Sequence, residues 1–364
     1  MVLIGGGHSH ALFLRQWALN PLPGVQLTLI SRDVLTPYSG MLPGYVAGHY
    51  SYDDIHVNLQ KLCSWAGVHF IEDEMTGIDL VNKNVKVRES ETVSYDLLLL
   101  DTGSTPLLNV PGAAAYTIPV KPVYSFIERL RELEQANATE IGIVGAGAGG
   151  YELAMAVAHR FRDNPMNIHW FLRGERALSD RSRRVGELAL KHALDAGIHI
   201  HRKFDVERVE SNCLFATDGR SQQFEQLLWC TAATAPEWPR QSGLEVDDRG
   251  FVATNKYLQS RSHPDVFASG DIGTQIDSPS AKAGVFAVRQ ASILLNNVRA
   301  QIKEEPLRVF VPQTDFLSLV STGKKHAIGS RSGLSFAGKW VWKLKHHIDQ
   351  SFMNKFINLP VRSL

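Results

Sequence analysis

Short apolar runs alternate with longer amphipathic segments along most of this 364-residue chain. The apolar runs predict buried strands at residues 2–4, 25–30, 85–88, 97–100, 141–144, 168–172, 199–202 and 266–268. Apolar residues at three- and four-residue steps predict helices at 11–19, 124–135, 151–161, 184–196 and 284–299. Thr36–Gly48, which is rich in Pro and Gly, is expected to be a loop. Strands that alternate with helices indicate an α/β fold with parallel sheets.

A glycine-rich turn follows the strand at 141–144 and opens a predicted helix. Gly145, Gly147 and Gly150 occupy the three positions of a GxGxxG motif. The first glycine permits a tight turn, the second lets the backbone approach a pyrophosphate, and the third lets the helix pack on the strand. A glycine-rich turn without a ligand is the alternative, which the flanking strand and helix disfavour.

A second such turn stands at the N-terminus, about 140 residues earlier. Gly5 and Gly7 hold the first two positions of the motif, whereas His10 replaces the third glycine. His8 and His10 could contact the phosphates of a dinucleotide, or His10 could simply fill the third-glycine position. Two such turns predict two Rossmann-like units and two dinucleotides. FAD and NADH or NADPH form the pair that this arrangement suggests, because electron transfer is the chemistry that needs both.

The strands that follow the two turns lack the usual acidic residue that binds a ribose. The first strand ends in Ser31, Arg32 and Asp33, of which Ser31 or Asp33 could take that role. The second is followed by Arg173, and an arginine at this position suits the 2′-phosphate of NADPH. A solvated surface arginine is the alternative for Arg173.

The charge, hydropathy and cysteine content of the chain indicate which kinds of partner and which cellular location to expect. The formal net charge is +1, which gives no field that favours nucleic acid. No apolar run approaches the roughly 18 residues of a transmembrane helix. Cys63, Cys213 and Cys230 are too scattered for a disulfide framework or a metal site, and they favour a cytoplasmic location. The pair His346-His347 is expected to be solvated, so no metal site is predicted.

The order of the motifs resembles the flavoproteins with two dinucleotide-binding domains, the pyridine nucleotide-disulfide oxidoreductase superfamily. Residues 100–106, with Thr102 and Gly103, resemble its first crossover between domains, and residues 229–233 resemble the second. Residues 263–271 resemble the motif that closes on FAD, in which Gly270 precedes an aspartate, here Asp271, that binds the ribityl and phosphate part.

The resemblance implies a discontinuous FAD-binding domain with an NAD(P)H-binding domain inserted. The expected boundaries are 1–112 and 248–314 for the FAD domain and 113–247 for the NAD(P)H domain. Residues 315–364 are expected to add strands and an amphipathic helix.

Within the superfamily, the chain lacks the cysteine pair of the disulfide reductases. The loop around Pro43 and the segment 280–290 resemble type II NADH dehydrogenases and sulfide:quinone reductases. Residues 5–11, 36–48 and 282–290 are most similar to a flavoprotein module fused to selenophosphate synthetase. The resemblance implies hydride transfer from NAD(P)H to FAD and then electron transfer to a quinone-like or other acceptor. The alternative is a redox-sensing or delivery module that has selenophosphate synthetase as a partner.

Two side chains are expected to act in catalysis. Lys282, followed by Ala283, stands where a helix N-terminus would point at the flavin, and its charge would stabilise the reduced ring. Glu152 resembles a glutamate near the nicotinamide in related dehydrogenases. The alternatives are an exposed lysine in the first turn of a helix and a carboxylate that complements a helix dipole.

The C-terminal segment carries a strong positive charge and a helical apolar face. Between Phe316 and Leu364 there is one acid, Asp349, and a formal charge of +7 from eight basic residues: Lys324, Lys325, Arg331, Lys339, Lys343, Lys345, Lys355 and Arg362. The apolar face consists of Val341, Leu344, Ile348, Phe352, Phe356 and Leu359. Trp340 and Trp342 at its start suit a membrane interface. Peripheral membrane contact, a homodimer and packing on the chain's own FAD domain are the three alternatives.

We expect no cysteine to take part in catalysis, because none of the three has a partner at redox spacing. The triple variant Cys63→Ser, Cys213→Ser, Cys230→Ser should retain NAD(P)H-dependent bleaching of the flavin, measured by absorbance. Loss of bleaching in a folded, FAD-loaded triple variant would contradict this expectation.

Overall fold

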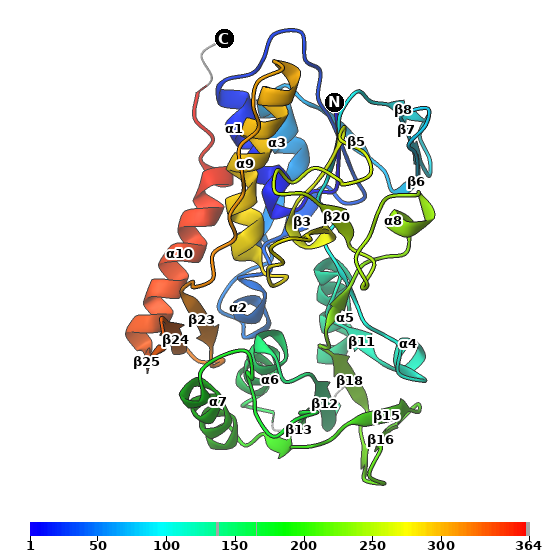
Figure 1. Ribbon diagram of the computed structural model, residues 1–364. Coiled ribbons are helices and arrows are strands. Elements are labelled where there is room, and N and C mark those ends of the chain that lie inside the picture. The colour runs from blue at the N-terminus through cyan, green and yellow to red at the C-terminus, as the bar shows by residue number, and fades with distance from the viewer. Residues whose placement is uncertain (136–137, 165, 362–364) are drawn as a thin grey trace.

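The computed structural model describes residues 1–135, 138–164 and 166–361 (Figure 1). Two α/β units lie one above the other in Figure 1, joined by crossing segments near the middle of the molecule. We call them the first unit (top) and the second unit (bottom). The C-terminal segment runs along one side of both.

The first unit is built on a five-stranded parallel sheet. Its strands, in spatial order, are β21 (Val266–Ala268), β9 (Leu98–Leu100), β1 (Val2–Ile4), β2 (Thr28–Ser31) and β5 (His69–Glu72). Helices α1 (His8–Leu19), α3 (Leu59–Ala66) and α9 (Gly284–Ile302) cover one face, where α1 packs on both others. Since β21 joins strands from far earlier in the chain, the first unit is discontinuous.

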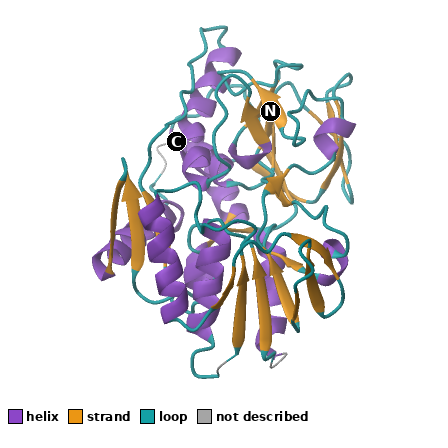
Figure 2. Cartoon of the chain, turned by 60° about the horizontal axis from the view of Figure 1, so that its bottom comes forward, coloured by secondary structure: helices purple, strands orange, loops and turns teal. Residues whose placement is uncertain are grey.

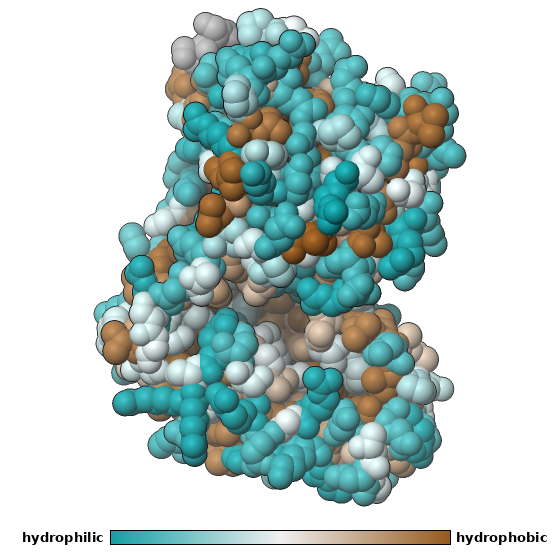
Figure 3. All heavy atoms as spheres, viewed as in Figure 1, coloured by the Kyte–Doolittle hydropathy of each residue, from teal (hydrophilic) through white to brown (hydrophobic). Residues whose placement is uncertain are grey.

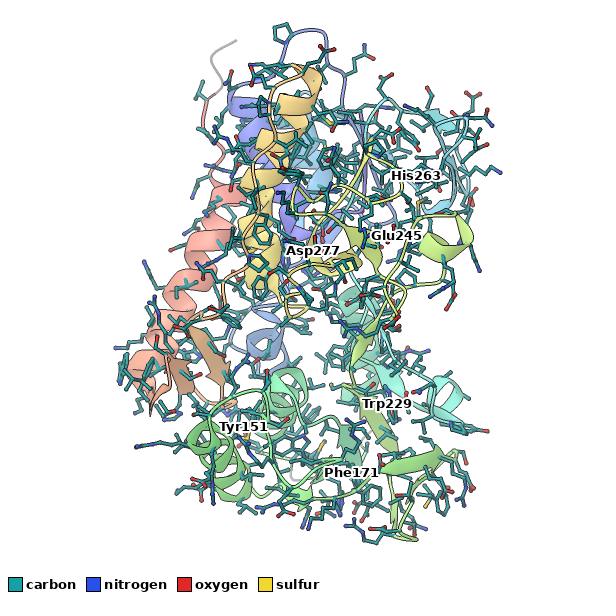
Figure 4. All side chains as sticks on the ribbon, viewed as in Figure 1. Tyr151, Phe171, Trp229, Glu245, His263 and Asp277 are labelled. Atoms are coloured by element: carbon teal, nitrogen blue, oxygen red, sulfur yellow. The ribbon has the colours of Figure 1, made fainter. Side chains whose placement is uncertain are left out.

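The second unit repeats the plan with residues from the middle of the chain. Its parallel sheet consists of β11 (Ile118–Pro119), β18 (Gln226–Trp229), β12 (Glu140–Val144), β13 (Asn167–Phe171) and β14 (His199–His201). Figure 2 shows these strands side by side, with helices on both sides. The helices are α5 (Val123–Gln135), α6 (Ala148–Arg160) and α7 (Arg183–Asp195). Tyr151, Phe171 and Trp229, labelled in Figure 4, are fully buried aromatic residues of its core.

Two short strands link the units. Strand β10 (Thr105–Pro106) lies where the chain passes from the first unit to the second, and β19 (Ala233–Thr234) lies where it returns. The two strands pair antiparallel, so these two connecting segments are hydrogen-bonded to each other. Smaller sheets flank the units: β3 (Leu35–Pro37) with β4 (His56–Asn58), β6 (Met75–Asp79) with β7 (Asn84–Val87) and β8 (Val93–Ser94), β15 (Val206–Val209) with β16 (Cys213–Ala216) and β17 (Ser221–Gln223), and β20 (Val252–Thr254) with β22 (Gly273–Gln275). Short helical turns complete the units: α2 (Leu42–Val46), η1 (Asp53–Ile55), α4 (Ala113–Tyr116), α8 (Trp238–Gln241) and η2 (Gly270–Ile272).

The C-terminal segment forms an antiparallel sheet and one long helix. The sheet is β23 (Ser318–Ser321), β24 (Ala327–Arg331) and β25 (Leu334–Gly338), and the helix is α10 (Lys339–Ile357). The sheet packs against α6 and α7 of the second unit, while α10 also contacts β4 of the first. The side chains of Val341, Phe352 and Phe356 are buried, whereas Ile348 is 43% exposed. The predicted apolar face therefore packs largely on the protein itself; Arg362 lies outside the described residues.

Every strand and helix predicted from the periodicity is present, with ends shifted by a few residues. The loop expected at Thr36–Gly48 is partly wrong, because it contains β3 at its start and the short helix α2. Pro43 stands in the first turn of α2, where its missing N–H has no intrahelical partner to lose. Proline there starts a helix instead of excluding one. The domain boundaries near residues 112, 248 and 314 stay predictions.

We expect Phe352→Ala to destabilise the protein by about 3 kcal/mol, because a large buried aromatic ring leaves a cavity. Phe352 is 6% exposed and stacks on Tyr38 with 4.4 Å between ring centroids. Denaturant unfolding measures the loss. Ile357→Ala on the same helix, at a side chain that is 55% exposed, is the matched control and should cost no more than about 0.5 kcal/mol. Similar losses for both variants would show that α10 does not depend on this contact.

Candidate active site

The first glycine turn packs closely against the segment that follows β9. Gly5 has a positive φ of 88°, and a Cβ there would lie 2.5 Å from the carbonyl oxygen of Asp101. A side chain at Gly7 would collide with the carboxylate of Asp101. Gly7 caps α1 without a side-chain hydrogen bond. Asp101 and the side chain of Leu59 therefore lie directly against the turn that starts α1.

The two histidines of this turn point in different directions. His10 is fully buried, and its Nδ1–H donates to the Gly5 carbonyl oxygen at 2.8 Å. Burial lowers the pKa of His10 to about 4, so its ring is neutral. His8 packs edge-on against Tyr38 and Phe352, with centroid distances of 5.1 and 5.8 Å. The geometry favours His10 as a filler of the third-glycine position; a phosphate contact for His8 stays a prediction.

Asp271 lies at the centre of a polar group that joins the two units. Lys121, just after β11, donates from Nζ to Asp271 Oδ2 and to the Ser104 hydroxyl, both at 2.7 Å. Ser104 donates to the same carboxylate oxygen at 2.8 Å. Burial opposes ionisation, but Lys121 and Ser104 outweigh it and hold the pKa of Asp271 below its ordinary value. The preceding Gly270 has a φ of 65° and donates its N–H to Gln290 Oε1 at 2.7 Å.

Lys282 lies near this group but does not contact Asp271 directly. Its Nζ donates to the Gly273 carbonyl oxygen at 2.6 Å and to Thr274 Oγ1 at 2.8 Å, and lies 3.9 Å from the centroid of the Phe251 ring. Burial lowers its pKa to about 8. Ala283 is the N-cap of α9, as expected for a helix that starts here. The predicted role of Lys282 beside the flavin stays a prediction.

The second glycine turn has the geometry that each glycine of the motif is expected to provide. Gly145 has a φ of 139°, and a side chain there would collide with the carbonyl of Cys230. Gly147 caps α6 and has open space around its Cα. A side chain at Gly150 would collide with the carbonyl of Gly145, so this glycine permits close packing of α6 on β12.

Neither ribose position carries a buried acid: Ser31 and Asp33 are half-buried, and Arg173 is exposed. Ser31 ends β2 and donates to the Asp33 carbonyl oxygen at 3.2 Å. Arg32 pairs with the Asp33 carboxylate at 3.0 Å and lies 3.7 Å over the Tyr124 ring. Arg173, two residues after β13 ends, is exposed at the surface of the second unit. Thr102 is exposed and Gly103 has a φ of 77°.

Glu152 of α6 belongs to a polar cluster at the junction of both units and the C-terminal segment. We call Glu152, Lys345, Asp349 and Tyr38 the junction cluster. Glu152 Oε1 accepts the Ser321 N–H at 2.7 Å. Burial raises the pKa of Glu152 to about 7, against the opposing charge of Lys345. A group with this pKa can gain or lose a proton near neutrality.

The other members of the junction cluster come from α10 and from the segment after β3. Lys345 Nζ donates to Asp349 Oδ2 at 2.8 Å and to the Gly40 carbonyl oxygen at 2.7 Å. The Tyr38 hydroxyl donates to Asp349, whose pKa burial raises despite Lys345. Figure 3 shows the surface hollowed between the two units, with apolar and neutral residues at the bottom of the hollow.

Two of the three cysteines have raised thiol pKa values, including Cys230, whose backbone lies against the second glycine turn. Burial raises the pKa of the Cys63 and Cys230 thiols to about 12, which keeps both protonated. Cys213 is partly exposed on β16. Among residues 1–135, 138–164 and 166–361, no three His, Cys, Asp or Glu side chains converge so that they could hold a metal ion. In the same part of the chain, no helix is long and apolar enough to cross a membrane.

Several polar residues of the site have no motif in the sequence. Asp101 directly follows a strand, which was a usable signal, since the ends of parallel strands meet at one edge. Lys121, Lys345 and Tyr38 reach the site through tertiary packing alone. The partner Asp271 of Lys121 lies 150 positions away and the partner Gly40 of Lys345 lies 305 positions away, so no local pattern reveals these two contacts.

The described residues fit two dinucleotides. Gly147, at the start of α6, has open space around it, and α1 and α9 begin side by side, with the Cβ position of Gly284 3.5 Å from His8 Nδ1. Positive ends of helices and free backbone N–H groups suit a pyrophosphate. Three buried polar atoms of these segments, Ser9 Oγ, His10 Nε2 and Ser269 Oγ, have no partner within the described residues.

Residues 1–291 match the family described as pyridine nucleotide-disulphide oxidoreductase. The chain belongs to this family. It is 26% identical to the NADH dehydrogenase-like protein YutJ of Bacillus subtilis, over 95% of this chain and 99% of YutJ. It is 28% identical to the demethylphylloquinone reductase NdbB of Synechocystis, over 76% of this chain and 72% of NdbB.

The fold is also that of known members. The structure of NDH2 from Plasmodium falciparum in complex with NADH superposes with a TM-score of 0.80 at 14% identity, covering 99% of each chain. The family match and the two relatives show that this chain is an NAD(P)H dehydrogenase and a flavoprotein, with FAD and NAD(P)H as cofactors. The expected superfamily, fold class and cofactors are confirmed.

The raised pKa of Glu152 predicts a specific pH dependence of stability. Because the pKa of about 7 in the folded state lies above the ordinary value of an unfolded chain, the native state loses stability as the pH rises through 7. Glu152→Gln cannot ionise, so relative to the parent it should gain about 1–2 kcal/mol between about pH 5.5 and pH 8. Denaturant unfolding of the FAD-loaded proteins at both pH values measures this gain. Glu128→Gln, at an exposed position of α5, is the control; an equal gain there would contradict the assignment.

Proposed function

We propose that this protein passes hydride from NAD(P)H to FAD and electrons onward to a quinone-like acceptor, without a cysteine redox pair. The observation that carries the proposal is the junction cluster. In this cluster the carboxyl group of Glu152, near the start of α6, has a pKa near neutrality. The thiols of Cys63 and Cys230, in contrast, stay protonated. Reduction of a quinone consumes protons as well as electrons, so such a group suits this acceptor. The similarity to YutJ, an NADH dehydrogenase-like protein, and to NdbB, a demethylphylloquinone reductase, supports the same reaction class.

We assign the two cofactors to the two glycine turns. FAD would lie against Gly5, Gly7, His8 and His10, with Ser31 and Arg32 toward its ribose, and with Pro43, Thr102, Gly103, Gly270, Asp271, Lys282 and Ala283 along the rest of the molecule. NAD(P)H would lie against Gly145, Gly147 and Gly150, with Arg173 toward a 2′-phosphate. When bound, FAD accepts the two electrons of the nicotinamide and delivers them to the acceptor.

The side chains of the junction cluster would orient the acceptor and hold its protons. Lys345 is fixed by the Asp349 carboxylate and the Gly40 carbonyl, so its ammonium keeps one position. The Tyr38 hydroxyl is held by Asp349 in the same way. Glu152 can carry a proton at neutral pH, and the Lys345 ammonium has a third N–H beyond the two that it donates to Asp349 and Gly40. The Tyr38 hydroxyl, which donates its proton to Asp349, can still accept a hydrogen bond.

The link to selenophosphate synthesis, whether as a redox-sensing or as a delivery module, stays a prediction. So do contact with a membrane and a homodimer through α10. No contact of the described residues favours any of these over the dehydrogenase function.

Anaerobic titration tests the proposal. NADH or NADPH should bleach the flavin of the purified protein, and a soluble quinone added afterwards should restore the oxidised spectrum faster than oxygen does. Reduction without reoxidation by any quinone would remove the acceptor assignment but leave the dehydrogenase step. Absence of bleaching by both nucleotides would overturn the proposal.

The variant Arg173→Ala should bind NADPH more weakly than the parent does, while its binding of NADH should change less, as measured in the same titration.

A further inference from the structure

A carboxylate occupies the place where this fold receives a pyrophosphate. Asp101 follows β9 and is 4% exposed. Its Oδ2 accepts the backbone N–H of His10 at 3.0 Å, and its carboxylate also accepts the N–H of Ser9. Its Oδ1 lies where a side chain at Gly270 would collide with it. Asp101 is therefore enclosed by the two segments that form the FAD site, α1 and η2.

The N-terminus of α1 has a limited number of free donors. The first intrahelical bond is donated by the Ala11 N–H to the Gly7 carbonyl oxygen, so the N–H groups before it need other partners. Asp101 takes those of Ser9 and His10. The N–H groups of Gly7 and His8 have no partner among the described residues and are left for a ligand. Asp101 and a pyrophosphate would thus share one helix end.

No cation compensates the carboxylate. Among the described residues no lysine or arginine contacts Asp101, because Lys121 pairs with Asp271 instead. Burial and the nearby charge of Asp271 raise the pKa of Asp101 to about 7, although the two backbone N–H groups oppose this shift. A second anion at the same helix end adds repulsion to a site that already disfavours charge.

We propose that Asp101 takes up a proton from solvent when FAD binds, so that loading of the cofactor is coupled to the protonation of this one carboxyl group. The protonated group keeps a carbonyl oxygen for the α1 N–H groups and gains an O–H donor for the phosphate or a neighbouring carbonyl. This coupling rests on FAD as the cofactor and is independent of the electron acceptor.

The other titratable groups around Asp101 can be separated from it. On α1, burial lowers the pKa of His8 and that of His10, the latter to about 4, so both rings are neutral above pH 7. On η2, Asp271 stays ionised because Lys121 and Ser104 outweigh its burial and hold its pKa low. Lys282, before α9, is the one neighbour whose pKa, about 8, falls near the same range. Loss of its charge would also weaken FAD binding at high pH, so it needs its own control.

The dissociation constant of FAD as a function of pH tests the coupling. Flavin fluorescence after dilution of the FAD-loaded full chain measures it. Between the pKa of the free protein and that of the complex, the constant should rise by up to about tenfold per pH unit, because one proton is released with FAD. Asp101→Asn should flatten this rise around neutrality, whereas Lys282→Gln should retain it. A rise in Asp101→Asn equal to that of the parent would overturn the proposal.

A second measurement needs no variant, and therefore stands even if Asp101→Asn fails to fold. Calorimetric titration of the FAD-stripped full chain with FAD, in two buffers of different ionisation enthalpy, counts the protons exchanged. We expect uptake of nearly one proton per FAD at about pH 7.5–8. Zero uptake, or release, would overturn the proposal while leaving FAD binding and the dehydrogenase reaction intact.

Discussion

The arrangement of both α/β units depends on the unpaired backbone N–H groups at the N-termini of their helices. In both units, parallel strands end at one edge of the sheet, and a glycine turn there starts a helix whose first N–H groups have no intrahelical partner. These unpaired N–H groups cost free energy when they are buried without a ligand, and they are stabilised when an anion binds next to them. Glycine is required at positions 5, 145 and 150 because backbone atoms occupy the space of a side chain, and at position 7 because the Asp101 carboxylate occupies it. Close packing and phosphate binding thus depend on the same missing Cβ atoms.

The third helix N-terminus, that of α9, and the long helix α10 extend this arrangement. Helix α9 begins beside α1, so the first unit directs two positive helix ends to one region. Helix α10 then brings Lys345 and Asp349 from the far end of the chain to Tyr38, where they meet Glu152 of the second unit. Charges of opposite sign are held close together in partly dry surroundings, which is the condition under which proton affinities move toward neutrality. The family supplies the two nucleotide sites, whereas this junction is assembled from segments outside both glycine motifs.

The sequence predicts the repeating architecture well because each element depends on local patterns. Strand-turn-helix starts at residues 2 and 141 are encoded by apolar runs and glycines that are neighbours in the chain. The α2 helix was missed because its Pro43 and Gly44 usually mark a loop, while the contacts that stabilise it come from α6. Lys121 illustrates the other limit: its partner Asp271 is 150 positions away, and nothing in the residues around Lys121 distinguishes it from a surface lysine. Lys282 donates to the carbonyl of Gly273 and lies over the Phe251 ring, contacts that no local pattern around it reveals, and its place beside the flavin stays a prediction.

The antiparallel pair β10–β19 is the only sheet that both crossings of the chain share within the described residues, and it would serve as a hinge if it acted alone. On the opposite side, however, α10 and its sheet are fastened to both units: the Ser321 N–H is bound by Glu152, and Trp65 Nε1–H donates to the Pro360 carbonyl oxygen at 2.9 Å. A body tied at two separate places cannot rotate about one of them without breaking the other. The spacing between the two glycine turns is therefore held by contacts at two separate places.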